Sequence, residues 1–553
     1  MKKCVKLNML KINQFIAAII SLFLIFAGIY SPVFAETKLD SKGTFHLVGT
    51  GPGDGDLLTV RALSIINKAD IIFANAKTKE QLVQHINFNG KEFYDSYGRL
   101  FPFYGKDCSA LSEEERSKER MSCEQYHQKQ KELVELVKKA VADGKKVAML
   151  TEGDPTIYGP SVWTIDALAE LNPVVVPGLS PFNAAHAALK VGLGEIIITA
   201  PSKKEDCKDT IESLAGHERT TMIIFMPRDF KELLARLSAV YPENTPVAVV
   251  SHAGHVDKEK AVIGTIEDIG KKLHGMDVRM SMVYVGKALE KAQFVHNKED
   301  YATGKGKFYL VGIGPGDSDL ATLRAIKVIE KADLIFAGTR IKDKFVPYLE
   351  GKTVLEGYHR LFPFYGMDCS KVSPEQKARE NMSCEEYQHK QREFASMVRE
   401  AVSKGKTVAM LDNGDPLIYG PCSWSLVELS DLDTEVVPGV SAFNAANAAI
   451  GKKVTGGVNS NSVILASGWS VEEMAVHQAT MVLFTMRTEF KKFIDALSKH
   501  YPPETPVAVV VSAGYQERER VMHATLGNVL ERLGEGKLPF EYLLYVGDFL
   551  AEK

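Results

Sequence analysis

Two acidic turns carry residue types that are suited to hold a polar ligand. Gly153-Asp154-Pro155 follows an apolar run directly, is trailed by Ile-Tyr-Gly, and returns as Gly414-Asp415-Pro416. An exposed carboxylate on such a rigid turn can bind an ammonium group or a ribose hydroxyl. An isolated loop acid is more often only a turn or helix-cap residue. The pattern marks Asp154 and Asp415 as candidate ligand residues, with a structural role as the alternative.

A glycine-rich turn lies upstream of each acidic turn. GTGPGD begins at Gly49, and GIGPGD begins at Gly312. Glycine permits positive φ and lets a backbone approach a ligand closely. The turns lack the lysine and hydroxyl of a phosphate loop and depart from the dinucleotide-binding spacing, so each one alone indicates only a tight turn.

A third repeated motif combines a cation with aromatic rings. RLFPFYG runs from Arg99 through Tyr104 and returns unchanged from Arg360 through Tyr365. Its arginine, two phenylalanines and tyrosine could place a guanidinium and ring faces against a planar macrocycle that bears carboxylates. The alternative is a disulfide-pinned lid, or a contact surface between the two copies.

Cysteine placement predicts one disulfide in each copy, because the second pair repeats both the DCS and SCE contexts and the spacing of the first. The predicted pairs are Cys108–Cys123 and Cys369–Cys384. No histidine recurs beside the cysteines in both copies, which disfavours zinc, and we expect no metal. Cys207 and Cys422 do not occupy equivalent positions, so a bridge between them has no support.

The elements that must position these motifs are written twice, in 44–286 and 307–547, with landmarks offset by about 261 residues. In the first copy, apolar runs alternate with helical patterns, which predicts a parallel sheet with helices on both faces. The predicted order is strand Thr44–Gly49, helix Leu57–Lys68, strand Ala69–Ala74, helix Glu124–Asp143 and strand Lys146–Leu150. Strands in the second half are expected at Val174–Val176, Met222–Phe225, Val247–Val250 and Met282–Val285. We therefore expect two α/β lobes per copy, with loops gathered at the carboxyl ends of the strands, where open sheets bind ligands.

Composition is that of an ordinary soluble protein, with 45% hydrophobic and 25% charged residues and a net charge of -3, which argues against nucleic-acid binding. Residues 1–11 carry four lysines, 15–30 are almost wholly apolar, and SPVFA ends at Ala35. This pattern predicts a secretory signal cleaved after Ala35 and a periplasmic protein, with an uncleaved inner-membrane anchor as the alternative. The predicted organisation is a signal peptide (1–35), a first unit (44–290), a linker (291–306) and a second unit (307–553).

Five motifs stand together in an order that resembles the tetrapyrrole methylase family. They are LVGTGPGDGDLLTVRAL, TEGDPTIYG, VVPGLS, TMIIFM and YPENTPVAVV, and all but the fourth recur cleanly in the second unit. Members of this family are S-adenosylmethionine enzymes that methylate uroporphyrinogen and the precorrins. The resemblance covers both units almost end to end, and YPENTPVAVV followed by DKEKAVIGTIEDI is most similar to the precorrin-4 branch. It implies a role in cobalamin or porphyrin biosynthesis.

The resemblance also implies where ligands would lie. S-adenosylmethionine would occupy the cleft between the lobes, on Gly153, Asp154, Ile157, Ser180, Pro181, Met226, Ala253 and Gly254 of the first unit and on Gly414, Asp415, Ile418, Ser441, Ala442, Ala513 and Gly514 of the second. The tetrapyrrole side would hold the glycine turns with the arginine and tyrosine of each aromatic motif: Gly51, Pro52, Gly53, Asp54, Arg99 and Tyr104, and Gly314, Pro315, Gly316, Asp317, Arg360 and Tyr365. Family members are usually homodimers, so the two units are expected to pack as a covalent pseudo-dimer.

Departures from the family leave the catalytic residues unassigned. Asn75 and Gly338 replace the acid proposed as a base at the end of the second strand, and Thr485 falls where the first unit has Met226. The segments 99–123 and 360–384 look like an insertion without a family counterpart. We expect a tetrapyrrole methyltransferase. Because the methyl donor is made in the cytosol, the alternatives are an exported tetrapyrrole-binding protein that has lost catalysis, and a structural duplication without a ligand.

Overall fold

A computed structural model of the protein describes residues 43–95, 97–201, 209–294, 306–457, 460–468, 470–484, 490–533, 538 and 541–551. The predicted signal segment, most of the predicted linker, Cys207 and Thr485 lie outside these ranges. Within the described ranges, no helix combines the length and apolar character needed to cross a bilayer.

The first lobe of each unit is a five-stranded parallel sheet. In the first unit the order is β3 (Glu92–Tyr94), β2 (Ile71–Phe73), β4 (Lys146–Thr151), β1 (Thr44–Gly49) and β5 (Val174–Val176). The second unit repeats it as β13 (Thr353–Leu355), β12 (Leu334–Phe336), β14 (Thr407–Asp412), β11 (Lys307–Gly312) and β15 (Thr434–Val437). The central strands β1 and β4 are buried, which explains their nearly continuous apolar sequences.

One ten-stranded sheet holds the second lobes of both units. Its first-unit half consists of β6 (Glu195–Thr199), β7 (Thr220–Phe225), β10 (Ser281–Val285), β8 (Pro246–Ser251) and β9 (Lys260–Thr265). Its second-unit half consists of β16 (Val463–Ser467), β17 (Thr480–Phe484), β20 (Tyr542–Val546), β18 (Pro506–Val511) and β19 (Arg520–Thr525). The halves join where β6 and β16 pair antiparallel, with Ile197 opposite Ile464.

The parallel sheet predicted from the first half of a unit is confirmed, and the structure adds two details of topology. Val174–Val176, predicted as a strand of the second half, is β5 and pairs with β1 at the edge of the first-lobe sheet. The second-lobe sheet is mixed, because β10 runs antiparallel to both β7 and β8. A short valine run is compatible with either sheet, so its sequence does not choose between them.

Helices cover both faces of the first-lobe sheet. The helices of this lobe and of the segment inserted in it are, in the first unit, α2 (Val60–Lys68), α3 (Ala76–Leu82), α4 (Glu113–Ser117), α5 (Cys123–Ala142) and α6 (Trp163–Ala167), and in the second α11 (Leu323–Lys331), α12 (Thr339–Lys344), α13 (Val346–Leu349), α14 (Pro374–Ala378), α15 (Cys384–Ser403) and α16 (Trp424–Glu428). Ser122 and Gln125 form a capping box at the start of α5, and its buried Tyr126, Leu133 and Val137 follow the helical period.

The ten-stranded sheet is also covered on both faces. Its helices are α7 (Pro181–Leu189), α8 (Ile211–Leu214), α9 (Phe230–Ser238), α10 (Ile269–Lys272), α17 (Ala442–Ile450), α18 (Val471–Ala475), α19 (Phe490–Leu497) and α20 (Val529–Leu533). On one face, Phe182 of α7 and Phe443 of α17 belong to the same buried cluster. The units therefore share a continuous hydrophobic core.

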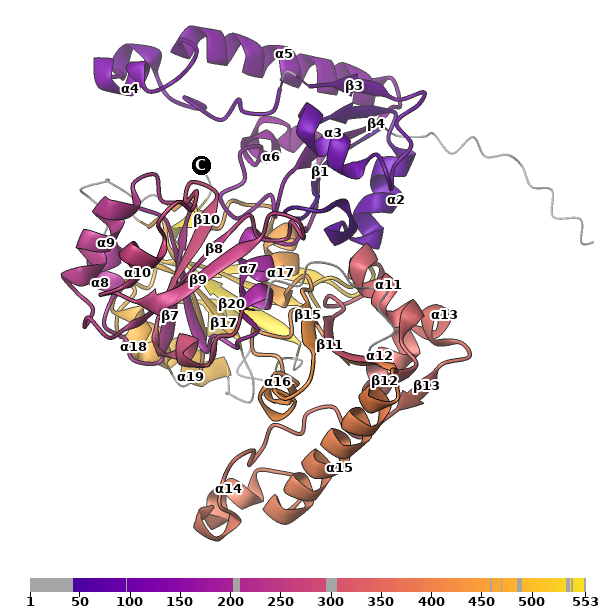
Figure 1. Ribbon diagram of the computed structural model, residues 1–553. Coiled ribbons are helices and arrows are strands. Elements are labelled where there is room, and N and C mark those ends of the chain that lie inside the picture. The colour runs from indigo at the N-terminus through magenta and orange to yellow at the C-terminus, as the bar shows by residue number, and fades with distance from the viewer. Residues whose placement is uncertain are drawn as a thin grey trace, which may run out of the picture.

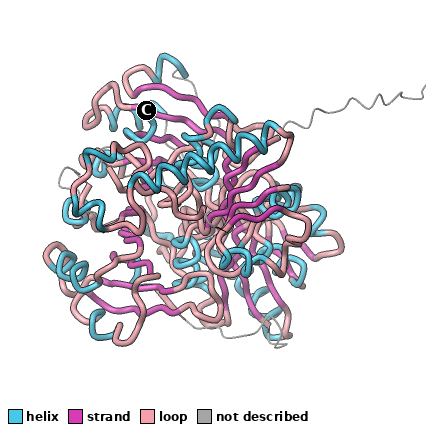
Figure 2. Tube along the Cα trace, turned by 90° about the horizontal axis from the view of Figure 1, so that it is seen from above, coloured by secondary structure: helices cyan, strands magenta, loops and turns pink. Residues whose placement is uncertain are grey.

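Each unit carries a helical arm. In Figure 1, α4 and α5 extend at the top of the molecule, while α14 and α15 extend at the bottom, with the ten-stranded sheet between them. Figure 2 presents the same arrangement from above, with the strands in magenta. The two arms lie on opposite sides of the ten-stranded sheet, so they do not contact each other.

Candidate ligand site

Three glycine turns meet at the carboxyl edge of the first-lobe sheet. The Gly153 N–H donates to the Gly51 carbonyl at 2.9 Å, which joins the glycine turn to the acidic turn. A Cβ on Gly49 would lie 2.6 Å from the nitrogen of Gly178 in the VVPGLS motif. Gly314 and Gly414 form the same bridge in the second unit. The structure thus brings together motifs that are about 100 residues apart in sequence.

The two acidic turns differ from the prediction in one respect, because their carboxylates are not exposed. Asp154 and Asp415 are each only 2% exposed. Asp154 Oδ1 accepts from the Thr156 N–H at 2.8 Å and from the Thr156 hydroxyl, while its Oδ2 accepts from Asn444 Nδ2 at 3.0 Å. Burial raises the pKa of Asp154 to about 6.

The second acidic turn is bonded across the units in the reciprocal way. Asp415 Oδ2 accepts from Asn183 Nδ2 at 2.8 Å and lies 2.9 Å from His186 Nε2, while its Oδ1 accepts from the Leu417 N–H. Asn183 and Asn444 occupy the same position in α7 and α17. Each acidic turn is therefore held by a helix of the other unit, and sequence reasoning missed these asparagines, although FNAA recurs in both VVPG motifs.

The acids of the glycine turns also join the two units. Arg324 Nη2 lies 2.7 Å from Asp56 Oδ1 and 3.2 Å from Asp54 Oδ2. In the reciprocal contact, Arg61 Nη2 lies 2.7 Å from Asp319 Oδ1 and 3.5 Å from Asp317 Oδ2. The predicted substrate-side residues Asp54 and Asp317 thus lie beside the junction of the units.

The second lobe approaches the glycine turn through the loop after β8. The Asp54 N–H donates to the Gly254 carbonyl at 3.1 Å, and a Cβ on Gly53 would lie 2.3 Å from the Gly254 carbonyl carbon. The Gly254 N–H donates to Glu259 Oε2 at 2.8 Å, and burial raises the pKa of Glu259 to about 7. Glu519 receives the Gly514 N–H in the same way at 2.7 Å. Sequence reasoning missed both glutamates, although they recur in equivalent positions.

The remaining predicted residues fall into buried and exposed groups. Ile157 and Ala253 are buried, and Ser180 with Pro181 begins α7 beside Gly153, whose Cβ would lie 3.2 Å from Pro181 Cδ. Met226 follows β7 with φ of 37° and is 44% exposed. The second unit matches the buried group: Ile418 is buried, and Ser441 with Ala442 begins α17.

Asn75 and Gly338 lie at the ends of the second strands of the two units, as the sequence predicts. Asn75 follows β2 and caps α3 by accepting the Thr78 N–H at 2.7 Å. Gly338 follows β12 at the start of α12, and a Cβ there would lie 3.5 Å from the His359 ring. Near that ring lie Asp412 and Cys422, which were not predicted as site residues.

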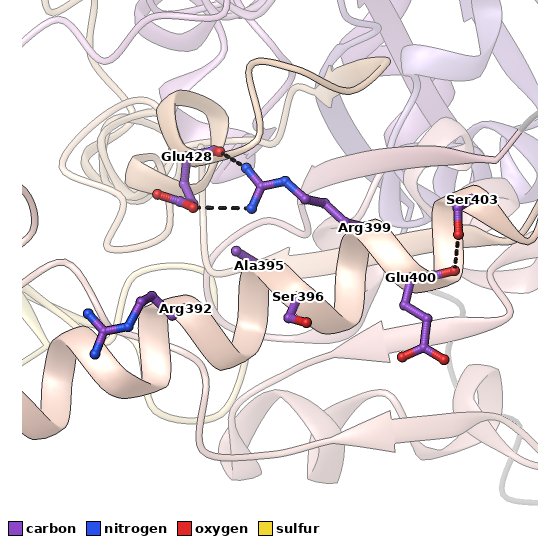
Figure 3. A pocket seen from close by; sticks show the side chains of 7 residues that line it. All are labelled: Arg392, Ala395, Ser396, Arg399, Glu400, Ser403 and Glu428. Carbon is purple, nitrogen blue, oxygen red and sulfur yellow. Dashed lines mark hydrogen bonds and ion pairs between the residues drawn. The ribbon is translucent and has the colours of Figure 1, made fainter.

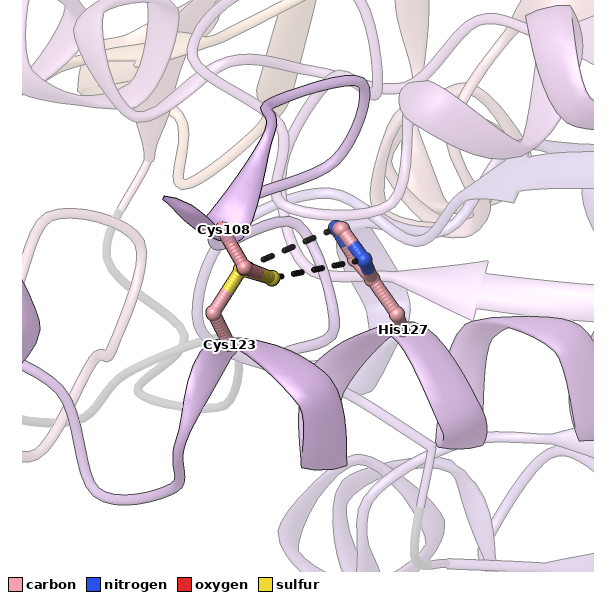
Figure 4. Close-up of side chains that lie close together, drawn as sticks. All are labelled: Cys108, Cys123 and His127. Carbon is pink, nitrogen blue, oxygen red and sulfur yellow. Dashed lines mark hydrogen bonds between the residues drawn. A yellow bond between two sulfur atoms is a disulfide. The ribbon is translucent and has the colours of Figure 1, made fainter. Parts of the chain in front are cut away.

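The inserted segments are pinned to the long helices by the predicted disulfides, and both pairs are confirmed. Cys108–Cys123 and Cys369–Cys384 each have Cα atoms 5.7 Å apart. His127 lies beside the first bridge (Figure 4), and its Nε2 is 2.9 Å from the Phe103 carbonyl oxygen. The described Cys422 is a free, buried thiol.

The aromatic motif is only partly available to a ligand. Phe101 is 41% exposed and lies beneath the Arg99 guanidinium at 5.6 Å from the ring centre, whereas Phe103 is buried. Tyr104 packs on Trp163, and Tyr365 packs on Trp424 in the second unit. Ligand binding by this surface stays a prediction, while the disulfide-pinned character of the segment is established.

A groove of about 650 Å³ lies along α15, away from the glycine turns (Figure 3). It is lined by Arg392, Ala395, Ser396, Arg399, Glu400, Ser403 and Glu428. Arg399 donates to the Glu428 carbonyl at 2.7 Å, but the equivalent residues in the first unit are Lys138 and Ala167. None of the predicted site residues lines this groove, so it is distinct from the candidate site.

Fold and site together define a duplicated two-lobed α/β protein whose glycine turns meet at the carboxyl edge of a parallel sheet. A sequence model of the family Tetrapyrrole (Corrin/Porphyrin) Methylases matches residues 44–270 and again 307–530. The chain therefore belongs to the tetrapyrrole methylase family. The resemblance drawn from the motifs is confirmed for both units.

Two curated relatives each match one unit. Cobalt-precorrin-4 C(11)-methyltransferase of Methanocaldococcus jannaschii is 30% identical over 45% of this chain and 89% of the relative. Precorrin-4 C(11)-methyltransferase of Pseudomonas aeruginosa is 28% identical over 44% of this chain and 90% of the relative.

Two solved structures are also similar over 44% of this chain. One is a cobalt precorrin-4 methyltransferase, with 23% identity, 96% of that chain covered and a TM-score of 0.34. The other is uroporphyrin-III C-methyl transferase from Thermus thermophilus in complex with S-adenyl homocysteine, with 21% identity, 98% coverage and a TM-score of 0.34.

Proposed function

We propose that this protein is an S-adenosylmethionine-dependent C-methyltransferase that acts on a tetrapyrrole of the precorrin or uroporphyrinogen type. The observation that carries the proposal is the match of both units to the tetrapyrrole methylase family across all the motifs that converge in the fold. The names of the precorrin-4 methyltransferase relatives support the reaction class.

The residues at the acidic turns fit a bound S-adenosylmethionine in part. A Cβ on Gly414 would make only ordinary van der Waals contacts, the nearest at 3.7 Å, so the backbone of this turn is not tightly covered by protein atoms. The Thr151 hydroxyl is buried and has no hydrogen-bond partner among the described residues, so it could receive or donate a bond to a polar ligand. The carboxylates of Asp154 and Asp415 do not fit the direct contact that was expected, since protein donors surround them.

We infer that backbone and apolar groups hold the cofactor, with the acids setting the shape of the turns. The residues that would contact it are Gly153, Ile157, Ser180, Pro181, Met226, Ala253 and Gly254, and their equivalents in the second unit. When bound, S-adenosylmethionine supplies a methyl group on an activated sulfonium. The chain has then to orient the acceptor carbon and exclude water, and a dedicated protein base is not required if the macrocycle provides the attacking electrons.

We further propose that the two units, 44–290 and 307–553, form a covalent version of a homodimer. The reciprocal contacts Asp154–Asn444 and Asp415–Asn183 support this arrangement, as does the antiparallel pairing of β6 with β16. Each unit would then complete the acidic turn of the other, which gives a physical reason for keeping two copies in one chain.

The decisive experiment is calorimetric titration of the purified, oxidised chain with S-adenosylmethionine, followed by transfer of labelled methyl to uroporphyrinogen III or precorrin-4. Met226→Ala is the informative variant, because this exposed side chain can be shortened with little effect on folding. We expect it to weaken cofactor binding about tenfold, or about 1.4 kcal/mol. Met367→Ala is the matched control, since Met367 is 48% exposed and lies in the inserted segment of the second unit.

An exported tetrapyrrole-binding protein without catalysis is a second candidate, favoured by one specific observation. Two disulfides, one in each unit, are compatible with an oxidising compartment, where the cytosolic methyl donor is not made. If the folded chain binds no S-adenosylmethionine but its tryptophan fluorescence is quenched when a porphyrin is added, the methyltransferase proposal fails and this one stands. Fractionation of the native host tests the predicted signal and periplasmic location.

A further inference from the structure

Three chemically reactive side chains lie close together at the carboxyl edge of the second unit's parallel sheet. His359 Nε2 lies 3.3 Å from Asp412 Oδ1, and Cys422 Sγ completes a set whose ligand atoms lie within 4.8 Å of one another. Asp412 ends β14 and its side chain is fully buried, as is Cys422, while the His359 side chain is 16% exposed. The cluster thus lies just below the surface.

The same place in the first unit lacks an imidazole, a carboxylate and a thiol. With the repeat offset of 261 residues, the equivalents of His359, Asp412 and Cys422 are Gly98, Thr151 and Ser161. Three changes that are scattered in sequence therefore converge on one point of the fold, in one copy only. The three residues are therefore not among those that the two copies share.

We propose that His359, Asp412 and Cys422 bind a divalent transition-metal ion of the zinc class. Imidazole, carboxylate and thiolate are the ligand types that Zn²⁺ uses in proteins. With metal bonds of about 2.0–2.1 Å, tetrahedral nitrogen and oxygen ligands lie about 3.3 Å apart, which equals the observed His359–Asp412 separation. Three protein ligands leave a fourth position for water or another ligand.

The unsatisfied atoms of the cluster favour a metal over a simple ion pair. His359 Nε2 and Asp412 Oδ1 face each other without the geometry of a hydrogen bond, and neither has another partner among the described residues. Buried polar atoms are normally paired, so two adjacent atoms without a hydrogen bond are available as ligands to an ion. The other Asp412 oxygen is held by the Cys422 N–H at 3.1 Å, which orients the carboxylate.

The backbone beside His359 also differs between the two units. Arg360 adopts a left-handed φ of 67°, whereas the equivalent Arg99 is not among the described residues with positive φ. Such a conformation is unfavourable for a residue with a side chain and persists where the surroundings require it.

The other cysteine–histidine group, at Cys108, Cys123 and His127, offers no thiolate because its sulfurs form a disulfide.

The test uses the full, untagged, oxidised chain after chelator treatment, and it does not depend on the proposed methyltransferase activity. Zn²⁺ is titrated against a chromophoric chelator, and Co²⁺ is used as an optical probe of the ligands. We expect one site per chain, with a thiolate-to-cobalt charge-transfer band and the visible bands of a tetrahedral complex.

Matched variants come from the first unit, which shows that the fold accepts these residues. Cys422→Ser should abolish the charge-transfer band. Asp412→Thr or His359→Gly should weaken Zn²⁺ binding by more than about 100-fold, the upper end of the effect of losing an outer-shell partner. The reverse exchange, Gly98→His with Thr151→Asp and Ser161→Cys, should create a second site.

The proposal is overturned if the wild type binds Zn²⁺ no better than the triple variant Cys422→Ser/Asp412→Thr/His359→Gly. It is equally overturned if Cys422→Ser leaves the cobalt spectrum unchanged. Circular dichroism of each variant confirms that a lost signal comes from lost ligands and not from unfolding.

Discussion

The bond between Asn183 and Asp415 should be a strong link between the two units. Asn183 Nδ2 donates to Asp415 Oδ2 at 2.8 Å, and both residues are almost fully buried. A hydrogen bond to a charged group contributes about 1.5–3 kcal/mol, and its loss leaves a buried carboxylate with one donor fewer. Asn183 also accepts the Ser180 N–H in the capping box of α7, which adds about 1 kcal/mol. Asn183→Ala should therefore lower the free energy of unfolding by about 2.5–4 kcal/mol.

A double-mutant cycle separates the link between units from the helix cap. The single variants Asn183→Ala and Asp415→Ala and their combination are unfolded in urea, with circular dichroism and tryptophan fluorescence as probes. The cap is lost in both variants that contain Asn183→Ala, so its contribution cancels and the coupling energy reports the contact with Asp415. We expect a coupling energy of about 1.5–3 kcal/mol.

A surface pair provides the control cycle. Gln128 donates to Glu132 at 2.9 Å on the exposed side of α5, and its coupling should stay below about 0.5 kcal/mol. If the buried pair couples no more strongly than this surface pair, the reasoning that the acidic turns bind the units together is refuted. Coincident transitions by both probes are required, because two units can unfold in separate steps.

Three further predictions concern charge and cross-links. The Asp154 pKa of about 6 lies above its unfolded value of 3.8, so its contribution to stability is complete below that lower value and is lost as pH rises through 6. Between about pH 4 and 7 this residue should lower the free energy of unfolding of the wild type by about 3 kcal/mol, and Asp154→Asn should not show this loss. Urea unfolding of both proteins across this pH range measures the difference, and a difference that does not change with pH contradicts the prediction. Replacing Cys108 and Cys123 together by serine should destabilise the protein by about 3 kcal/mol and speed proteolysis of the arm, whereas an unchanged cleavage pattern would show that the bridge does not pin it. Arg324→Ala should lower the free energy of unfolding in urea by about 1–2 kcal/mol, because its ion pairs across the units are lost. Arg279→Ala, whose side chain is 79% exposed, should leave the urea midpoint almost unchanged, and equal effects of the two variants would argue against the inter-unit pairs.

Much of the local structure could be predicted because its causes are local. The α5 helix follows from its capping residues and the period of its apolar side chains, and both lie within 20 residues. The disulfides follow from two cysteine pairs with the same contexts and a separation of 15 residues in each unit. The meeting of the glycine turns at the carboxyl edge follows from their position directly after buried strands, since parallel strands end at one edge of a sheet.

Tertiary structure alone decided which groups those motifs meet. The sequence of an acidic turn is the same whether its carboxylate faces solvent or a partner, so the burial of Asp154 and Asp415 depended on the packing of α7 and α17 between the units. The shared sheet depended in the same way on β6 meeting β16, two short apolar strands more than 260 residues apart. His359, Asp412 and Cys422 became a candidate site only in three dimensions, because side-chain chemistry depends on distance in space and the chain alone does not specify which distant residues the fold brings together.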